Sequence, residues 1–108
     1  MNNPYIIIFD SAIEKEKLEL LFEAIRSSFV SKKATNNIFI IAVPLGERAN
    51  SIYNTIDTKL ITKVPFVVTT FIDYFGNMPL EIFSWFKQTF PQIDLLEPIT
   101  IQKNISPK

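Results

Sequence analysis

The chain has neither cysteine nor histidine among its 108 residues. Without thiols it can form no disulfide framework and no thiolate metal site. Without imidazole it lacks the commonest general base and the commonest zinc ligand of proteins. These two absences exclude histidine-based catalytic triads and zinc hydrolysis.

The chain also lacks an excess of charge of either sign and any long apolar run. Eleven Lys and Arg residues balance eleven Asp and Glu residues, so no overall positive field attracts nucleic acid and only a local patch could do so. No apolar run reaches the length of a membrane span, and residues 1–4 do not have the charged start of a signal peptide. We therefore predict a soluble, cytoplasmic protein with no membrane partner.

What the sequence does have is hydrophobic content, at 47% of residues with 13% aromatic. Burial of that much apolar surface can offset the conformational entropy lost on folding. A chain of this length suits one compact core. We predict a single domain over 1–108, with a core at about 5–90 and a tail at 91–108.

Short apolar runs rich in β-branched residues predict strands. The predicted strands are 5–9, 29–34, 38–43 and 65–72. Lys32 and Lys33 would discourage edge-to-edge pairing of the second strand. In the first and third runs both alternating sets of residues are apolar, so both faces of the predicted sheet need cover.

Three longer segments have apolar residues at helical spacing. The first contains Leu18, Leu21, Phe22, Ile25 and Phe29. Ser11 and Glu14 have the spacing of a capping box, which predicts that this helix begins at Ser11. A second helix is predicted over roughly 46–60, and a third over 80–90 with Pro79 as its first residue.

This element order predicts an α/β (α+β sandwich) fold, ferredoxin-like β-α-β-β-α-β with an additional C-terminal helix. The first two helices would cover one sheet face and leave the other bare. The helix at 80–90 could lie over part of the bare face. An exposed apolar sheet is nevertheless unusual on a soluble monomer, so we predict a homodimer through the sheet face.

Asp10 is the candidate catalytic and metal-binding residue, because it follows a central strand at the end of the sheet where α/β proteins often hold their sites. A structural interpretation is that Asp10 favours the positive end of the helix dipole or helps Ser11 to cap the helix. A functional interpretation is that two copies of Asp10 meet near a dimer axis and share Mg²⁺ or Mn²⁺, which activates a water.

Lys32, Lys33 and Arg48 are the candidate nucleic-acid-binding residues, although zero net charge favours ordinary solvated positions for them. Aromatic residues at 73–77 and Trp85 could stack on bases, but packing explains the same residues. Gly46 has no second glycine near it, so we predict no nucleotide cofactor.

The run from Tyr5 to Asp10, the long first helix, the hairpin at 29–43 and the strand from Phe66 to Phe71, followed by Gly76, Pro79 and Trp85, form a recognisable pattern. It resembles the small ferredoxin-fold superfamily of the CRISPR spacer-acquisition subunit, the virulence-associated protein D endoribonucleases and the SinR-like proteins.

The resemblance implies a homodimer formed through the sheets. It matches Asp10 to the aspartate that the nuclease members use around a metal ion, and Ile99-Thr100-Ile101 to a C-terminal strand that adds to the partner's sheet. Those nucleases surround the aspartate with further polar and basic residues, whereas here Ser11, Ala12 and Ile13 follow it.

Two hypotheses follow for the function. The first is a non-catalytic homodimeric interaction or nucleic-acid-associated module of the SinR-like type, which fits the small number of catalytic side chains. The alternative is a metal-dependent nuclease that uses paired Asp10 carboxylates at the dimer interface.

Overall fold

The computed structural model describes residues 2–70 and 79–93. The chain divides into two compact units, Met1–Phe71 and Ile72–Lys108. The first unit contains a four-stranded sheet with two helices, and the second contains a third helix.

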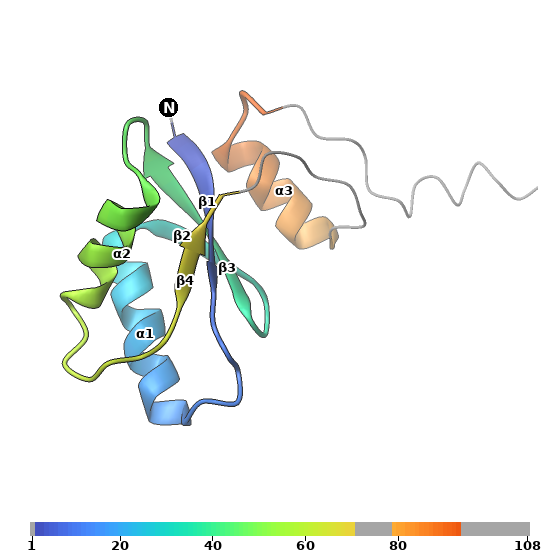
Figure 1. Cartoon of the computed structure of the whole chain (residues 1–108). Helices are drawn as coiled ribbons and strands as arrows, with labels where there is room; N and C mark the ends of the chain where they lie inside the picture. The colour runs from blue at the N-terminus through green and yellow to red at the C-terminus, as the bar shows by residue number, and fades with distance from the viewer. Residues whose placement is uncertain (1, 71–78, 94–108) are drawn as a thin grey trace, which may run out of the picture. The chain divides into compact units, whose positions relative to one another are not determined.

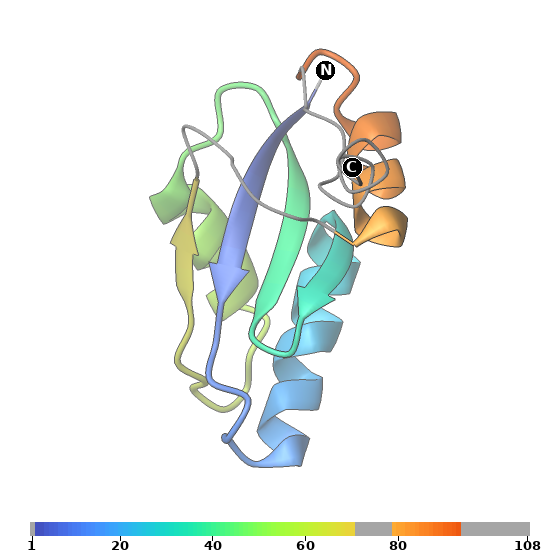
Figure 2. The same cartoon turned by 90° about the vertical axis from the view of Figure 1, so that its right-hand side faces the viewer.

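The sheet consists of β1 (Asn2–Ile8), β2 (Val30–Thr35), β3 (Ile38–Pro44) and β4 (Val67–Thr69). Its order is β2-β3-β1-β4, and the four strands lie side by side in Figure 2. Every neighbouring pair is antiparallel. Each of the four strands overlaps a segment that was predicted to form a strand.

β1 and β4 differ most in length from the prediction. β1 starts at Asn2 and contains Pro4, which pairs with Ala42 on β3. On the other side of β1, only Ile6 to Ile8 pair with β4. Pro4 lies beyond this pairing, so its missing N–H removes no hydrogen bond between β1 and β4. β4 has three residues where eight were expected, and the last two of those eight lie outside the described residues.

The helices α1 (Lys15–Ser28) and α2 (Ala49–Asp57) lie on the same face of the sheet, as Figure 1 shows. The alternate strand residues that face them pack against the apolar sides of the two helices to form the hydrophobic core. The core consists of Ile7, Phe9, Leu21, Ala24, Ile25, Phe39, Ile41, Val43, Ile52, Ile56, Val64 and Phe66. This layer of helices on a sheet confirms the predicted α+β sandwich.

The predicted capping box at Ser11 is wrong. The Ile13 N–H donates to the Asp10 carbonyl oxygen at 3.2 Å, which makes a tight turn rather than a first helical turn. The first helical hydrogen bond runs from the Leu18 N–H to the Glu14 carbonyl oxygen at 3.0 Å. α1 therefore begins at Lys15, with Glu14 as its N-cap.

The second helix is shorter than predicted at both ends. Gly46 has a φ of 97°, a left-handed conformation that glycine adopts readily and an α-helix excludes. After Asp57 the chain continues in tight turns, with the Lys59 N–H donating to the Ile56 carbonyl oxygen at 3.0 Å.

The face of the sheet opposite α1 and α2 is also apolar. Ile8 pairs with Ile38 on β3 and with Val67 on β4, and Val30 pairs with Ala42. Directly paired residues share a face, and Ile7 belongs to the core, so Ile8 and its partners lie on the opposite face. Ile8, Val30 and Val67 are 41%, 62% and 57% exposed, whereas Ile40 and Ala42 of the same face are each 6% exposed. The exposed apolar side chains of this face therefore surround a buried centre. We call this surface the second face.

In the second unit, α3 spans Leu80–Thr89 and confirms the predicted helix, with Phe90 as its C-cap rather than its last residue. Pro79 is its N-cap rather than its first residue, and its carbonyl oxygen accepts the Phe83 N–H at 2.9 Å. Over residues 2–70 and 79–93, no helix has the length and apolar character needed to cross a membrane.

Candidate functional site

Asp10 lies exposed at the carboxyl end of β1, in the turn that leads to α1. Its Oδ1 accepts the Ala12 N–H at 2.9 Å. A side chain that bonds the backbone two residues later forms an Asx-type turn. Asp10 therefore shapes the connection, and it is not part of a capping box.

Asn37 fixes this corner to the β2–β3 turn. Its carbonyl oxygen accepts the Phe9 N–H at 2.9 Å, and its Nδ2 donates to the Phe9 carbonyl oxygen at 3.1 Å. The same Nδ2 lies 3.4 Å from Ser11 Oγ. These contacts hold the Phe9 backbone and the Ser11 side chain, the two neighbours of Asp10, against the β2–β3 turn.

A divalent cation prefers several oxygen ligands, commonly carboxylates. Within the described part of the chain, no group of three or more acidic, His or Cys side chains is placed to hold a metal ion. Among the described residues Asp10 is therefore a single carboxylate ligand, and a Mg²⁺ or Mn²⁺ site there would need further ligands.

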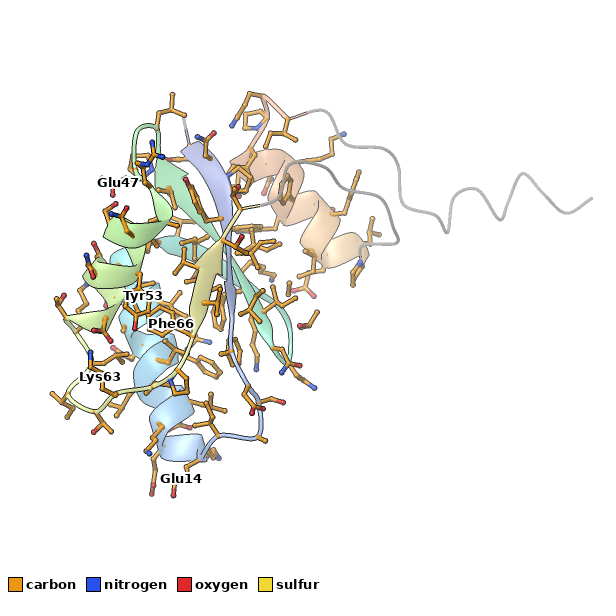
Figure 3. The ribbon with its side chains drawn as sticks, in the orientation of Figure 1. Glu14, Glu47, Tyr53, Lys63 and Phe66 are labelled. Carbon is orange, nitrogen blue, oxygen red and sulfur yellow. The ribbon has the colours of Figure 1, made fainter. Side chains whose placement is uncertain are left out.

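The structure does not bring the three candidate basic residues together. Lys32 and Lys33 are consecutive in β2 and point to opposite faces of the sheet. Lys33 lies on the helix face, 5.0 Å from the centroid of the Phe22 ring. Arg48 follows β3 at the end of the sheet where Asn2 pairs with Pro44, whereas Asp10 lies beyond the Ile8–Ile38 pair at the other end. Figure 3 shows this separation through Glu47 and Glu14, which lie at opposite ends of the first unit.

Arg26 is a cation that was missing from the predicted set. Its guanidinium carbon lies 5.7 Å from the Phe22 ring centroid and 5.6 Å from that of Phe39. Phe22 and Arg26 are four residues apart on α1, a spacing at which helical side chains meet. That spacing is the sequence signal for this contact, whereas the arrival of Lys33 at the same ring depends on the tertiary fold.

Arg48 belongs to a polar loop between β3 and α2. Its backbone N–H donates to Ser51 Oγ at 3.3 Å, and Ser51 Oγ donates to Glu47 Oε1 at 2.7 Å. The Tyr5 hydroxyl donates to the Glu47 carbonyl oxygen at 3.1 Å. Beside this loop lies an open hollow lined by Tyr5, Gly46, Glu47, Arg48, Ala49, Val68, Thr69 and Thr70. The hydrogen bonds hold the loop in place, and they already engage the Tyr5 hydroxyl.

Lys63, in the α2–β4 connection, forms an ion pair with Asp57 at the end of α2. Figure 3 shows Lys63 on the same side of the sheet as Tyr53 and Phe66, whose rings are stacked. The Asp57 side chain is 15% exposed, and its Oδ1 has no hydrogen-bond partner within the described ranges. The hydrogen bond to Asp57 raises the pKa of Lys63 above its ordinary value of 10.5, and the nearby negative charge adds to the effect. This pair secures the connection between α2 and β4.

Trp85, a candidate for base stacking, packs within the second unit. Its ring lies edge-on to Phe90 with the centroids 5.9 Å apart, which agrees with the packing interpretation. The aromatic segment at 73–77 and the candidate strand Ile99-Thr100-Ile101 lie outside the described residues.

Comparisons of the chain with protein-family models, with curated proteins and with solved structures found no match.

Proposed function

We propose that the chain is a non-catalytic homodimeric interaction or nucleic-acid-associated module of the SinR-like type with a ferredoxin-like fold. The strand order β2-β3-β1-β4 and the antiparallel neighbours support the fold, because a split βαβ arrangement places its first and third strands in the centre. Within residues 2–70 and 79–93, Asp10 is a single carboxylate with few polar groups around it, and catalysis of hydrolysis usually needs more. This supports a role in binding rather than in turnover.

The observation that carries the proposal is the apolar second face. Ile8, Val30 and Val67 come from three different strands, and all three are exposed. Neither α1 nor α2 covers this surface, because both pack on the opposite side of the sheet. A second copy that presents the same face would bury these side chains in a symmetric, self-complementary contact.

The two edges of the sheet are poorly suited to association. β2 carries Lys32 and Lys33, and its pairing with β3 is irregular between Lys33 and Thr35. Charged side chains and bulges are the usual protections of an edge strand. Within the described part of the chain, β4 offers only three residues. Copies of the chain should therefore meet through the second face rather than by joining their sheets edge to edge.

The experiment is a measurement of solution mass by light scattering. The wild type should be a dimer, and Ile8→Asp and Val67→Asp should each be monomeric, because a charge would have to be buried in the contact. The control is Ile61→Asp, since Ile61 is 89% exposed and lies in the α2–β4 connection. A monomeric wild type, or dimers that survive both substitutions, would contradict the proposal.

The second candidate function is a metal-dependent nuclease. It is supported by the exposed carboxylate of Asp10 at the carboxyl end of a central strand. If it holds, Asp10→Asn should abolish cleavage in Mg²⁺ or Mn²⁺ while the protein stays dimeric, because the amide can still accept the Ala12 N–H but no longer supplies charge to the metal. Glu14→Gln, at a neighbouring exposed carboxylate, is the control. The binding module predicts no cleavage by any of these proteins, and an Asp10→Asn variant that cleaves fully would eliminate the nuclease mechanism.

A further inference from the structure

Three phenylalanines form a compact cluster between α1 and the sheet. The ring centroids are 5.2 Å apart for Phe9 and Phe22, 5.2 Å for Phe22 and Phe39, and 5.9 Å for Phe9 and Phe39. Phe9 and Phe39 are buried, whereas Phe22 is half-buried at the rim of the core. The cluster therefore presents one partly accessible ring at the surface.

Two cations lie against that ring. Arg26 is 5.7 Å and Lys33 is 5.0 Å from the Phe22 centroid, so the charges are no farther apart than these two distances combined. Arg26 comes from α1 and Lys33 from the edge strand β2. The fold brings together two positive charges that are seven positions apart in the chain and belong to different elements.

Neither cation is neutralised by an ion pair within residues 2–70 and 79–93. In contrast, Lys17 lies 3.6 Å from a carboxylate oxygen of Glu14, and Lys63 is paired with Asp57. Contact with an aromatic ring leaves the charge of a cation intact and restricts the motion of its side chain. Arg26 and Lys33 are therefore held in place and remain available to an anion.

We propose that Arg26 and Lys33 bind the phosphate backbone of a nucleic acid. This inference rests on the proposed function, in which nucleic-acid association is one role of the module. Two cations held against the same ring can each contact a phosphate oxygen of one backbone. Because both also occupy the Phe22 ring, base stacking on that ring is not expected, and the contact carries no sequence information.

The surroundings set the expected strength of this contact. Glu19 and Glu23 lie on α1 near Arg26 and line a shallow hollow with Lys15, Leu18 and Phe22. Their negative charges oppose the approach of a phosphate, and the chain as a whole has zero net charge. The binding should therefore be weak and strongly dependent on salt.

The test is the fluorescence anisotropy of a labelled oligothymidylate titrated with the full chain at about 50 mM salt and at higher salt. The double variant Arg26→Gln with Lys33→Gln should bind at least about tenfold more weakly, and its salt slope should fall by about 1.4 for two lost single-strand phosphate contacts. The control is Lys17→Gln with Lys59→Gln, which removes the same charge elsewhere on the surface and should stay within about twofold of the wild type.

The variant Arg26→Lys with Lys33→Arg keeps both positive charges and should bind like the wild type. It shows whether the double glutamine variant loses binding through its charge rather than through misfolding. Binding of a labelled duplex as well as the single strand would still support the proposal, because both present a phosphate backbone. Absence of binding at low salt, equal losses in the test and control variants, or full displacement by inorganic phosphate at constant ionic strength would overturn it.

Light scattering on the same samples separates this inference from the proposed function. A dimer that binds no oligonucleotide overturns only the role of Arg26 and Lys33. A monomer that binds through these residues overturns the homodimer and leaves the phosphate contact supported.

Discussion

At the scale of single residues, the sequence predicts where a residue lies along the chain better than it predicts the contacts which that residue makes. The sequence indicated correctly that Asp10 follows the first strand, but the capping role assigned to Ser11 was wrong. The reason is local competition, because the Asp10 carboxylate accepts the Ala12 N–H and ties this segment into a turn. The part of Asn37 in holding the Phe9 backbone could not be predicted, since it depends on contacts between residues 28 positions apart.

The Lys63–Asp57 pair gives a prediction at this scale. Because the pKa of Lys63 is raised above 10.5 in the folded state, the pair contributes stability below the pKa of the unfolded chain. That contribution is lost as the pH rises through the folded value, where the ammonium loses its proton. Lys63→Gln should therefore lower Tm at pH 8, and the difference from the wild type should shrink above pH 10.5.

Thermal unfolding followed by circular dichroism at a series of pH values measures this effect. Lys59→Gln is the matched control, since Lys59 lies in the same connection and donates to Ser27 Oγ instead of to a carboxylate. A Tm difference for Lys63→Gln that stays constant up to strongly alkaline pH would show that the ion pair does not act through charge.

At the scale of elements, hydrophobic periodicity located the strands and helices well, because burial on one or both faces imposes a repeat on the chain. It was less successful at their ends. α2 starts after Gly46, whose φ of 97° excludes it from the helix, although glycine beside a helix start had been read as part of the helix. β4 is short because its pairing with β1 covers only Ile6 to Ile8, and pairing length cannot be read from one strand alone.

The grouping of the candidate basic residues also depends on contacts between elements, which the sequence does not show. Lys32 and Lys33 were grouped because they are adjacent in the sequence, but adjacent strand residues point to opposite faces. The grouping that the structure favours pairs Lys33 with Arg26 of a different element, through the Phe22 ring. Alternation along the strand could have separated the two lysines from sequence alone, whereas the approach of α1 to β2 required the fold.

At the scale of the whole molecule, the order of elements and the apolar character of both sheet faces were predictable, and they lead to the same proposal. The first and third strands are apolar on both alternating sets, as the second face requires. The division of the chain into two units was not predicted, because no glycine- or serine-rich linker marks it in the sequence.

A homodimer makes thermal stability depend on protein concentration, and this is the last prediction. If two copies bury the second face and unfolding separates them, mass action favours the folded dimer as concentration rises. For two chains of this size, Tm should rise by about 3 °C for each tenfold increase in concentration. Ile8→Asp, with its charge at an exposed position of that face, should unfold at a Tm that does not depend on concentration, whereas Ile61→Asp should keep the dependence. A wild-type Tm that is the same at all concentrations would mean that the second face does not join two copies in the folded state, and the apolar surface would then need a different partner.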